Sequence, residues 1–399
     1  MNTRILSFLF AGHMVNDLHQ GAIPALLPFL ILRHDMSYSA AAVIVFAFTG
    51  TATIMQPLFG YLSDRFGGTW TISAGVMLTS LGFALIGVAP DYGLLIAAVI
   101  VSGLGSALFH PDAAGMVNYA SGEAKATAMS IFGVGGVLGF LIGPFAITAA
   151  VLAFGLKGVA ITMLPASLVA VLIILQHDRL RQLRGAVGTT DQEGEGCRND
   201  NWLAFTALSL TIIGKSVIYY GLFTFIPLYW TDVLQQSQIA GAAALTVFSA
   251  GGVFGNLLGG RLADRFGHKK IVVGGCCLLI PLLPALLLVE NVFAANVLIA
   301  TVGALLLFTY GPTVVLGQEY LPNHIGFSSG MTLGVAFSIG GMVAPLLGNL
   351  ADQEGLSTAL KSIIFLPILV TAIASTLPTR RSLRKISLDG RTGQGAVKS

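Results

Sequence analysis

Long uninterrupted apolar runs constrain the fold of this chain more than any other feature of its sequence. The runs at 131–147 and 272–289 contain no charged side chain. A run of about 20 apolar residues crosses the hydrocarbon core of a membrane as a helix, whereas barrel strands would alternate apolar and polar side chains. Only 10% of the 399 residues are charged, against about 25% in soluble domains. The sequence therefore predicts an all-α membrane protein.

Polar turns divide the chain into twelve predicted transmembrane helices, six on each side of one long polar segment. The predicted spans are 5–32, 38–62, 70–89, 93–117, 126–152, 157–176, 203–230, 237–260, 270–289, 292–317, 326–351 and 357–377. The polar segment contains several glycines and both charge signs, which favours a flexible linker. The predicted domains are a six-helix bundle at 1–176, a linker at 177–202, a second six-helix bundle at 203–377 and a tail at 378–399.

The distribution of lysine and arginine predicts the orientation in the membrane. If both termini and the linker are cytoplasmic, all but four of the 21 basic residues lie in the cytoplasm. Arg33, Lys157 and Lys361 fall on the other side, and Lys215 falls within a span. Cytoplasmic loops carry such an excess of positive charge. A net charge of +3 gives no reason to expect a nucleic-acid partner, and we expect loop cations to contact anionic lipids.

The two halves of the sequence repeat one another. The segment GYLSDRFG at 60–67 recurs as GRLADRFG at 260–267, and Pro111 and Pro144 recur as Pro312 and Pro345. Such a repeat predicts two six-helix bundles related by an axis along the membrane normal, with a substrate site between them. The glycines permit a tight turn, and the acidic and basic residues are expected to pair across helices. The predicted gating motif consists of Gly60, Asp64, Arg65, Gly67, Gly260, Asp264, Arg265 and Gly267.

The doubled motif resembles that of major facilitator superfamily transporters, and the resemblance covers essentially the whole chain. More narrowly, ND at 16–17, FHPD at 109–112, SIFGVGG at 130–136 and QEYLP at 318–322 resemble the fosmidomycin resistance branch. This resemblance implies a drug:proton antiporter in the inner membrane of a bacterium, acting as a monomer. The chain departs from the superfamily at Val99, where an arginine is expected, and at Ile147, where a glycine of the antiporter motif is expected.

The first predicted span carries a polar stripe. His13, Asn16, Asp17 and Gln20 are spaced i, i+3, i+4 and i+7, so they share one face of a helix. Ionisable residues inside a membrane are costly and mark functional sites. We predict that Asp17 carries a proton and that His13, Asn16 and Gln20 bind substrate.

Lys215 lies at a similar depth in the seventh span as Asp17 in the first. The two spans are symmetry mates in the expected fold, so the two charges would face one another across the cavity. Lys215 is predicted to receive an anionic substrate, with Tyr219 lining the cavity beside it. The alternative is a static ion pair between Asp17 and Lys215 that holds the halves together.

Two further sites are predicted to take part in proton coupling. His110 and Asp112 flank Pro111 in the fourth span, and histidine titrates near neutrality. The alternative is that His110 only satisfies the carbonyl freed by the proline. Glu319, near the inner end of the tenth span, is the other site, with Gln318 beside it as a substrate ligand. The alternative for Glu319 is a carboxylate that faces the headgroup water.

Several catalytic motifs are absent from the sequence. It contains no HExxH, GxSxG, Walker A or paired-cysteine motif, which indicates neither an enzyme nor a cofactor or metal site. The prediction is a secondary active transporter that exports small drug-like or anionic molecules, such as fosmidomycin, by proton antiport and alternating access. The alternatives are proton symport that imports an organic anion or sugar, and an intramembrane enzyme or receptor.

Overall fold

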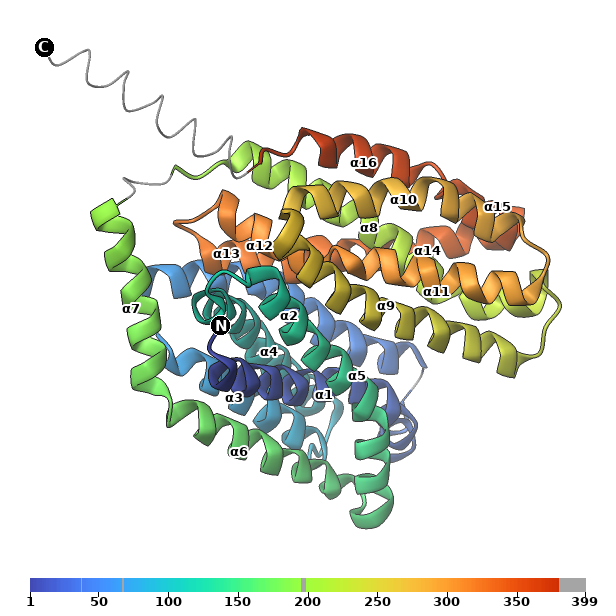
Figure 1. Ribbon diagram of the computed structural model, residues 1–399. Helices are drawn as coiled ribbons and strands as arrows, with labels where there is room; N and C mark the ends of the chain where they lie inside the picture. Colours follow the sequence, from blue (N-terminus) through green and yellow to red (C-terminus); the bar gives the residue numbers. More distant parts are fainter. Residues whose placement is uncertain (37, 67, 195–198, 380–399) are drawn as a thin grey trace, which may run out of the picture. The chain divides into compact units, whose positions relative to one another are not determined.

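The computed structural model describes residues 1–36, 38–66, 68–194 and 199–379, and every regular element among them is a helix (Figure 1). The predicted all-α fold is confirmed. In chain order the elements are α1 (Thr3–His34), α2 (Tyr38–Phe66), α3 (Trp70–Ile86), α4 (Tyr92–Ser121), α5 (Lys125–Phe154), η1 (Leu156–Thr162), α6 (Met163–Ile174), α7 (His177–Gly194), α8 (Trp202–Leu228), η2 (Tyr229–Val233), α9 (Gln238–Phe266), α10 (His268–Leu288), α11 (Val292–Phe308), α12 (Tyr310–Tyr320), α13 (Ile325–Gly330), η3 (Met331–Val335), α14 (Ala336–Glu354), α15 (Leu356–Ser362) and α16 (Leu366–Thr376).

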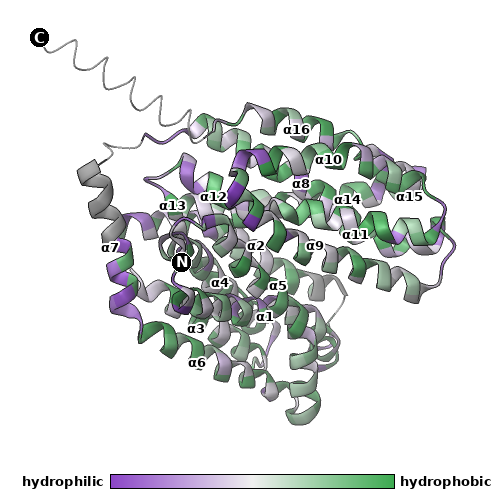
Figure 2. Ribbon diagram, in the orientation of Figure 1, coloured by the Kyte–Doolittle hydropathy of each residue, from purple (hydrophilic) through white to green (hydrophobic). Residues whose placement is uncertain are grey.

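Ten helical segments of the described chain are long and apolar enough to cross a membrane. They coincide with ten of the twelve predicted spans, and the other two are also helices. α3 has 17 residues, and α1 has 32 residues but carries the polar stripe. Figure 2 shows the contrast between the apolar α6 and α16 and the polar first turns of α7.

Contacts divide the chain into two compact units. The first unit contains Met1–Glu193 and His324–Val335, and the second contains Gly194–Asn323 and Ala336–Ser399. The short helices α13 and η3 therefore belong with the helices of the first half. The domain boundaries at 176/177 and 202/203 stay predictions.

The internal repeat is visible in the way each unit fixes its first long helix. Asn2 and Asn201 each cap their own helix with the side chain. The backbone N–H of Asn2 donates to the carbonyl of Ala120 over 2.8 Å, and that of Asn201 donates to the carbonyl of Tyr320 over 2.7 Å. Each unit thus ties the start of its first helix to the end of its fourth span by the same bond.

Glycines allow the close helix packing inside the second unit. Gly251, Gly255 and Gly259 lie one turn apart on α9, and a Cβ added at any of them would clash with a carbonyl of α11. Membrane helices gain little from hydrophobic burial against one another, so they associate through such close backbone approaches. The glycine spacing in the sequence therefore specifies which face of α9 meets α11.

The first part of the predicted linker is helical rather than flexible. α7 lies against the first unit, where Leu180 is buried and His177 Nδ1 lies 2.7 Å from Thr69 Oγ1. Arg184 donates to the carbonyl of Ser63 over 2.6 Å. These contacts explain why the segment is helical rather than flexible, because a helix that packs one face on a bundle is stabilised beyond its own propensity. Residues 195–198 of the linker lie outside the described residues.

Candidate functional site

The polar stripe of α1 meets α4 inside the first unit. Nε2 of His13 lies 3.2 Å from Oδ2 of Asp17, and Nε2 of His110 on α4 lies 3.1 Å from Oδ1 of the same carboxylate. The three side chains are 5%, 16% and 10% exposed, in the order His13, Asp17, His110. We call them the triad. Asp17, predicted from the sequence as a proton carrier, thus sits between two imidazole rings.

The outer nitrogens of both rings are fixed by backbone carbonyls. Nδ1 of His13 lies 2.7 Å from the oxygen of Phe132 on α5, and Nδ1 of His110 lies 2.8 Å from the oxygen of Ser106. The His13 ring also stacks on the Phe132 ring, with centroids 4.1 Å apart. Both imidazoles are therefore held in orientation from the side opposite Asp17.

Asn16 joins the triad to the rest of the unit. Its amide nitrogen donates to Asp17 Oδ1 and to Ser106 Oγ, each over 3.1 Å, and its oxygen accepts from Thr79 Oγ1 on α3 over 2.9 Å. The side chain is fully buried. Asn16 was predicted as a substrate ligand, and in the described structure its amide group binds Asp17, Ser106 and Thr79.

The ligand atoms of the triad lie within 4.8 Å of one another, a spacing also found around metal ions. Each histidine here contacts the carboxylate directly at a hydrogen-bonding distance. These contacts describe a hydrogen-bonded cluster of one carboxylate and two imidazoles.

Gly136 of α5 leaves the space that the triad occupies. A Cβ at this position would lie 2.5 Å from His13 Nε2 and 2.6 Å from Asp17 Oδ2. We expect Gly136→Ala to separate these two atoms and to lower the free energy of unfolding by about 1–3 kcal/mol through overpacking. Thermal unfolding measures this effect. Gly274→Ala is the control, because a Cβ there meets no atom within 4 Å; equal behaviour of the two variants would contradict the prediction.

The backbone partner of His110 is not the carbonyl that Pro111 frees. Pro111 lacks an N–H and so frees the carbonyl of Ala107, four residues earlier. His110 instead bonds the carbonyl of Ser106 and directs its other nitrogen to Asp17.

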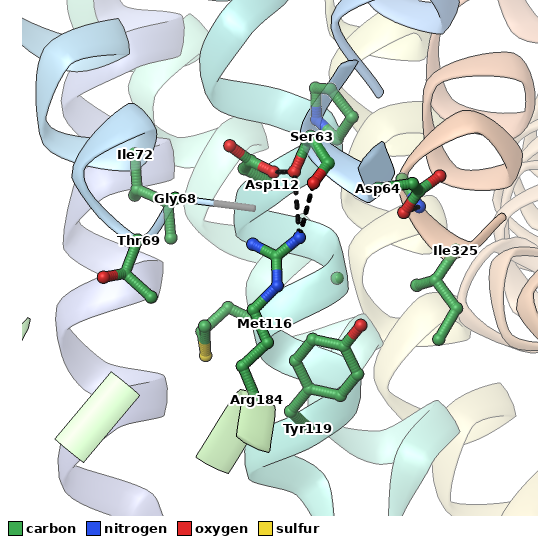
Figure 3. A pocket seen from close by; sticks show the side chains of 13 residues that line it. Ser63, Asp64, Gly68, Thr69, Ile72, Asp112, Met116, Tyr119, Arg184 and Ile325 are labelled. Carbon is green, nitrogen blue, oxygen red and sulfur yellow. Dashed lines mark hydrogen bonds between the residues drawn. The ribbon is translucent and has the colours of Figure 1, made fainter. Parts of the chain in front are cut away.

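Asp112 does not join the triad, although the sequence placed it in one cluster with His110. Two residues along a helix correspond to a rotation of about 200°, so the two side chains face different neighbours. The Asp112 carboxylate accepts from the hydroxyls of Ser63 and Thr71. Figure 3 shows it in a pocket of the first unit, with Arg184 of α7 donating to Ser63 beside it.

Asp64 of the gating motif binds backbone amides rather than an arginine. Its carboxylate accepts from the N–H groups of Gly326 and Phe327 at the start of α13, over 2.8 and 2.9 Å. These two hydrogen bonds take the place of the expected pairing of Asp64 with Arg65, because a negative charge is favoured beside the first amides of a helix. Arg65 lies over the ring of Phe66, 5.5 Å from its centroid. Gly60 permits the approach, since a Cβ there would clash with the backbone of Gly326.

We expect Asp64→Ala to weaken the attachment of α13 to α2. It removes two charge-assisted hydrogen bonds, which contribute about 1.5–3 kcal/mol each, so detachment should become at least about tenfold more frequent. The measurement is the rate of thiol labelling of Ser329→Cys, because Ser329 is fully buried. An unchanged labelling rate, equal to that of the exposed control Asp352→Ala, would contradict the prediction.

Lys215 is buried in the second unit. Within the described part of that unit it donates to the hydroxyl of Thr309 rather than to a carboxylate. Tyr219, one turn further along α8, packs its ring on Phe223 and Phe248, with centroids 5.8 and 5.4 Å away. The ion pair between Asp17 and Lys215 stays a prediction, because the two residues belong to different units.

Glu319 lies in a second cluster with a histidine. His268 Nδ1 is 3.4 Å from Glu319 Oε1, and its Nε2 is 3.6 Å from Asp264 Oδ1. Asp264 therefore contacts His268, where the sequence predicted Arg265. Arg265 lies over the ring of Phe266, 5.2 Å from the centroid.

The remaining predicted residues have less specific surroundings. Gln20 is half-buried on α1, and Gln318 is buried on α12. Gly267 has a φ of 102°, a left-handed conformation that suits glycine, where α9 ends. Gly260 lies within α9. Gly67 lies outside the described residues.

A family model described as the Major Facilitator Superfamily matches residues 9–382. The chain belongs to the major facilitator superfamily. This transporter is 30% identical to YfnC, an MFS-type transporter of Bacillus subtilis, over 96% of this chain and 94% of the relative. It is 29% identical to the fosmidomycin resistance protein of Escherichia coli, over 92% of this chain and 90% of that protein. The predicted family is confirmed, and the transporter is a multi-pass membrane protein.

Solved structures share the fold of this transporter. The crystal structure of FucP in the outward conformation has a TM-score of 0.72 at 15% identity, covering 94% of this chain and 98% of FucP. The human organic anion transporter MFSD10 has a TM-score of 0.71 at 14% identity, covering 94% and 99% of the two chains. These similarities confirm the predicted major facilitator fold.

Three contacts of this transporter were not predicted from its sequence. They are those of Arg184 at the Asp112 pocket, His268 beside Glu319, and the amides of α13 on Asp64. These three contacts join segments far apart in the sequence. The spacing of Asp264 and His268 by four residues could have revealed only the contact between those two side chains.

Proposed function

We propose that this transporter exports small drug-like or anionic molecules, such as fosmidomycin, in exchange for protons. The observation that carries the proposal is the triad, in which an acidic residue and two imidazoles meet within a transmembrane bundle. Such buried ionisable groups in membrane spans are typical of proton pathways. The name of the relative, fosmidomycin resistance protein, supports export of that compound.

Proton coupling is assigned to Asp17 and His110, with Asp112 and Glu319 as further proton-binding groups. Asp112 accepts from two hydroxyls, and Glu319 lies beside His268. A carboxylate whose partners are hydroxyls can gain a proton without leaving a buried cation unpaired. If Glu319 gains a proton, His268 still has Asp264 as a partner.

Substrate binding is assigned first to Lys215 and Tyr219 of the second unit. Lys215 supplies a buried cation for an acidic substrate, and Tyr219 supplies an aromatic wall. Gln20 and Gln318 are assigned as further hydrogen-bonding groups for the substrate. An anion is held most strongly by a charge-assisted hydrogen bond in a site shielded from water.

Alternating access is proposed to break and remake the contact between Asp64 and α13. The carboxylate binds two amides of this helix in the present conformation. Rocking that separates α13 from α2 would expose the glycine pair Gly60 and Gly326. The repeated motif at 260–267 is assigned the matching role in the second half.

We place the transporter in the bacterial inner membrane, with both termini in the cytoplasm, as a monomer surrounded by lipid. The excess of basic residues in the predicted cytoplasmic loops supports this orientation, and the bacterial relatives support the location. The proposed partners are the small-molecule substrate, protons and membrane lipids.

Import by proton symport is the second candidate. A buried lysine without a carboxylate partner among the described residues of its unit suits uptake of an organic anion as well as export. Direction separates the two functions: export lowers the cellular concentration of the substrate, and import raises it.

Overexpression in a fosmidomycin-sensitive bacterium tests the direction. Export predicts that the inhibitory concentration of fosmidomycin rises severalfold in cells with the wild-type transporter and stays at the baseline with Asp17→Asn. A fall in the inhibitory concentration would indicate import and contradict the proposal. Immunoblotting of the membrane fraction checks that both proteins are present in equal amounts.

A further inference from the structure

The triad has more hydrogen-bond acceptors than two neutral histidines can serve. All four ring nitrogens lie within 3.2 Å of an oxygen: two face backbone carbonyls, and two face the Asp17 carboxylate. Carbonyl and ionised carboxylate oxygens only accept hydrogen bonds, so each contact needs one proton. A neutral imidazole carries one proton, which gives two protons for four contacts.

The carbonyls of Phe132 and Ser106 take the protons of the two neutral rings, on Nδ1. The two remaining contacts, between each Nε2 and one oxygen of Asp17, then need one further proton each. This count is independent of whether a given proton rests on the nitrogen or on the oxygen. From it we infer that the triad is a two-proton site, in which His13 is a proton-binding residue equal to His110. This inference rests on the proposed proton coupling and gives it a stoichiometry of two.

The surroundings of the triad contain few groups that could alter this count. Asn16 contacts Asp17 and Ser106 contacts His110 through neutral groups, while Thr79 donates to Asn16. The helix α5 contributes Phe132 and Gly136. His19 lies on the same helix as Asp17, and its ring lies against that of Phe83, with 4.9 Å between the centroids.

Four other charged groups on α1, α2, α4 and α5 have contacts of their own. Asp112 of α4 accepts from two hydroxyls, and Asp64 of α2 accepts from two amides. Lys125 of α5 donates to the side chain of Asn118, and Arg4 at the start of α1 lies 6.0 Å from the ring centroid of Phe8. Without the two protons, the triad holds one ionised carboxylate and two neutral rings, so its net charge is −1. Binding of both protons changes this charge to +1.

Losing both protons turns the two Nε2 contacts into repulsive ones. Each nitrogen would then direct a lone pair at a carboxylate oxygen 3.1–3.2 Å away. One of these contacts joins α1 to α4, so proton release favours separation of the two helices at this level. The count thus gives a physical reason for coupling between protonation and helix movement.

Direct titration tests the proton count. The purified transporter in lipid nanodiscs should bind about two more protons between about pH 9 and about pH 5 than the triple variant His13→Gln, Asp17→Asn, His110→Gln. Nitrogen-15 NMR of labelled histidines, assigned with the single variants, should show that both rings respond and that replacing either one shifts the titration of the other. His34→Gln, at the end of α1, is the control and should leave both signals in place.

Other outcomes of the titration would contradict the inference. A difference of one proton, or a His13 ring that keeps the same state over the whole range, would overturn the inference. So would one tightly bound transition-metal ion per chain in the purified protein, because a metal would then replace the two protons.

Transport measurements provide a second, independent test of the proton count. With the voltage held at zero, two protons per substrate predict about a hundredfold accumulation of fosmidomycin on the acidic side for each pH unit, and one proton predicts about tenfold. After correction for the protonation of fosmidomycin itself, we expect the wild type near a hundredfold and His13→Gln at most near tenfold. A wild type near tenfold would overturn the inference. If fosmidomycin were not transported, the proposed function would fail while the titration still decided the proton count.

Discussion

Replacing Asp17 by Asn is expected to abolish proton-driven accumulation of substrate while leaving the fold intact. The accumulation ratio should fall to about 1, from at least about tenfold per pH unit in the wild type. The carboxylate is the group that both imidazoles share, so its loss removes the charge that holds their protons. An asparagine can still donate to one ring and accept from the other, which preserves the packing of α1 against α4.

The variant must be compared under two conditions. Exchange of labelled for unlabelled substrate without a pH gradient should continue in Asp17→Asn, because exchange needs no net proton movement. Asp352→Asn, which changes an exposed carboxylate on α14, is the control for loss of charge alone. Accumulation by Asp17→Asn at the wild-type level would remove Asp17 from proton coupling.

Replacing Lys215 by Gln is expected to weaken binding of an anionic substrate about tenfold to hundredfold. A hydrogen bond to a charged group contributes about 1.5–3 kcal/mol, and each 1.4 kcal/mol is about a factor of ten in affinity. The same variant should unfold at a higher temperature, since it removes an ammonium group that is buried against a hydroxyl. Binding by isothermal calorimetry and thermal unfolding measure the two effects on the same sample.

The opposite signs of these two effects make the prediction specific. Lys361→Gln changes a lysine near the end of α15 and should leave binding unchanged. Lys215→Arg keeps the charge and should retain most of the affinity. If Lys215→Gln lowered both affinity and stability, Lys215 would serve the packing of the second unit rather than the substrate.

The fold could be predicted from the sequence because its signals are local. Apolar runs bounded by polar turns define the spans, and the repeats at 60–67 and 260–267 define the two halves. The repeated caps at Asn2 and Asn201 follow the same symmetry. The helix at the start of the linker was missed, because α7 depends on contacts with Thr69 and Ser63 that lie far away in the sequence.

The candidate site could be predicted only within each helix. Helical spacing placed His13, Asn16 and Asp17 on one face, and the structure has them on one face. The partners across helices depend on the rotation of each helix about its axis, which the sequence does not reveal. That rotation brings His110 to Asp17 and turns Asp112 toward Ser63.

The gating motif illustrates a second limit. Its acidic and basic residues suggested an ion pair, and the structure has Asp64 on the amides of α13 instead. Backbone donors are present in every sequence, so no residue pattern marks those that a carboxylate will bind. The glycines Gly60 and Gly326 were the available signal, since they indicate close contact between two backbones.

The most direct test of proton-coupled export is fosmidomycin transport by the purified protein in liposomes with an imposed pH gradient. We expect fosmidomycin to accumulate on the acidic side, a protonophore that collapses the gradient to stop this accumulation, and Asp17→Asn to show none. Accumulation on the alkaline side would indicate symport. Fosmidomycin transport that is the same with and without the pH gradient would contradict proton coupling and the role assigned to the triad.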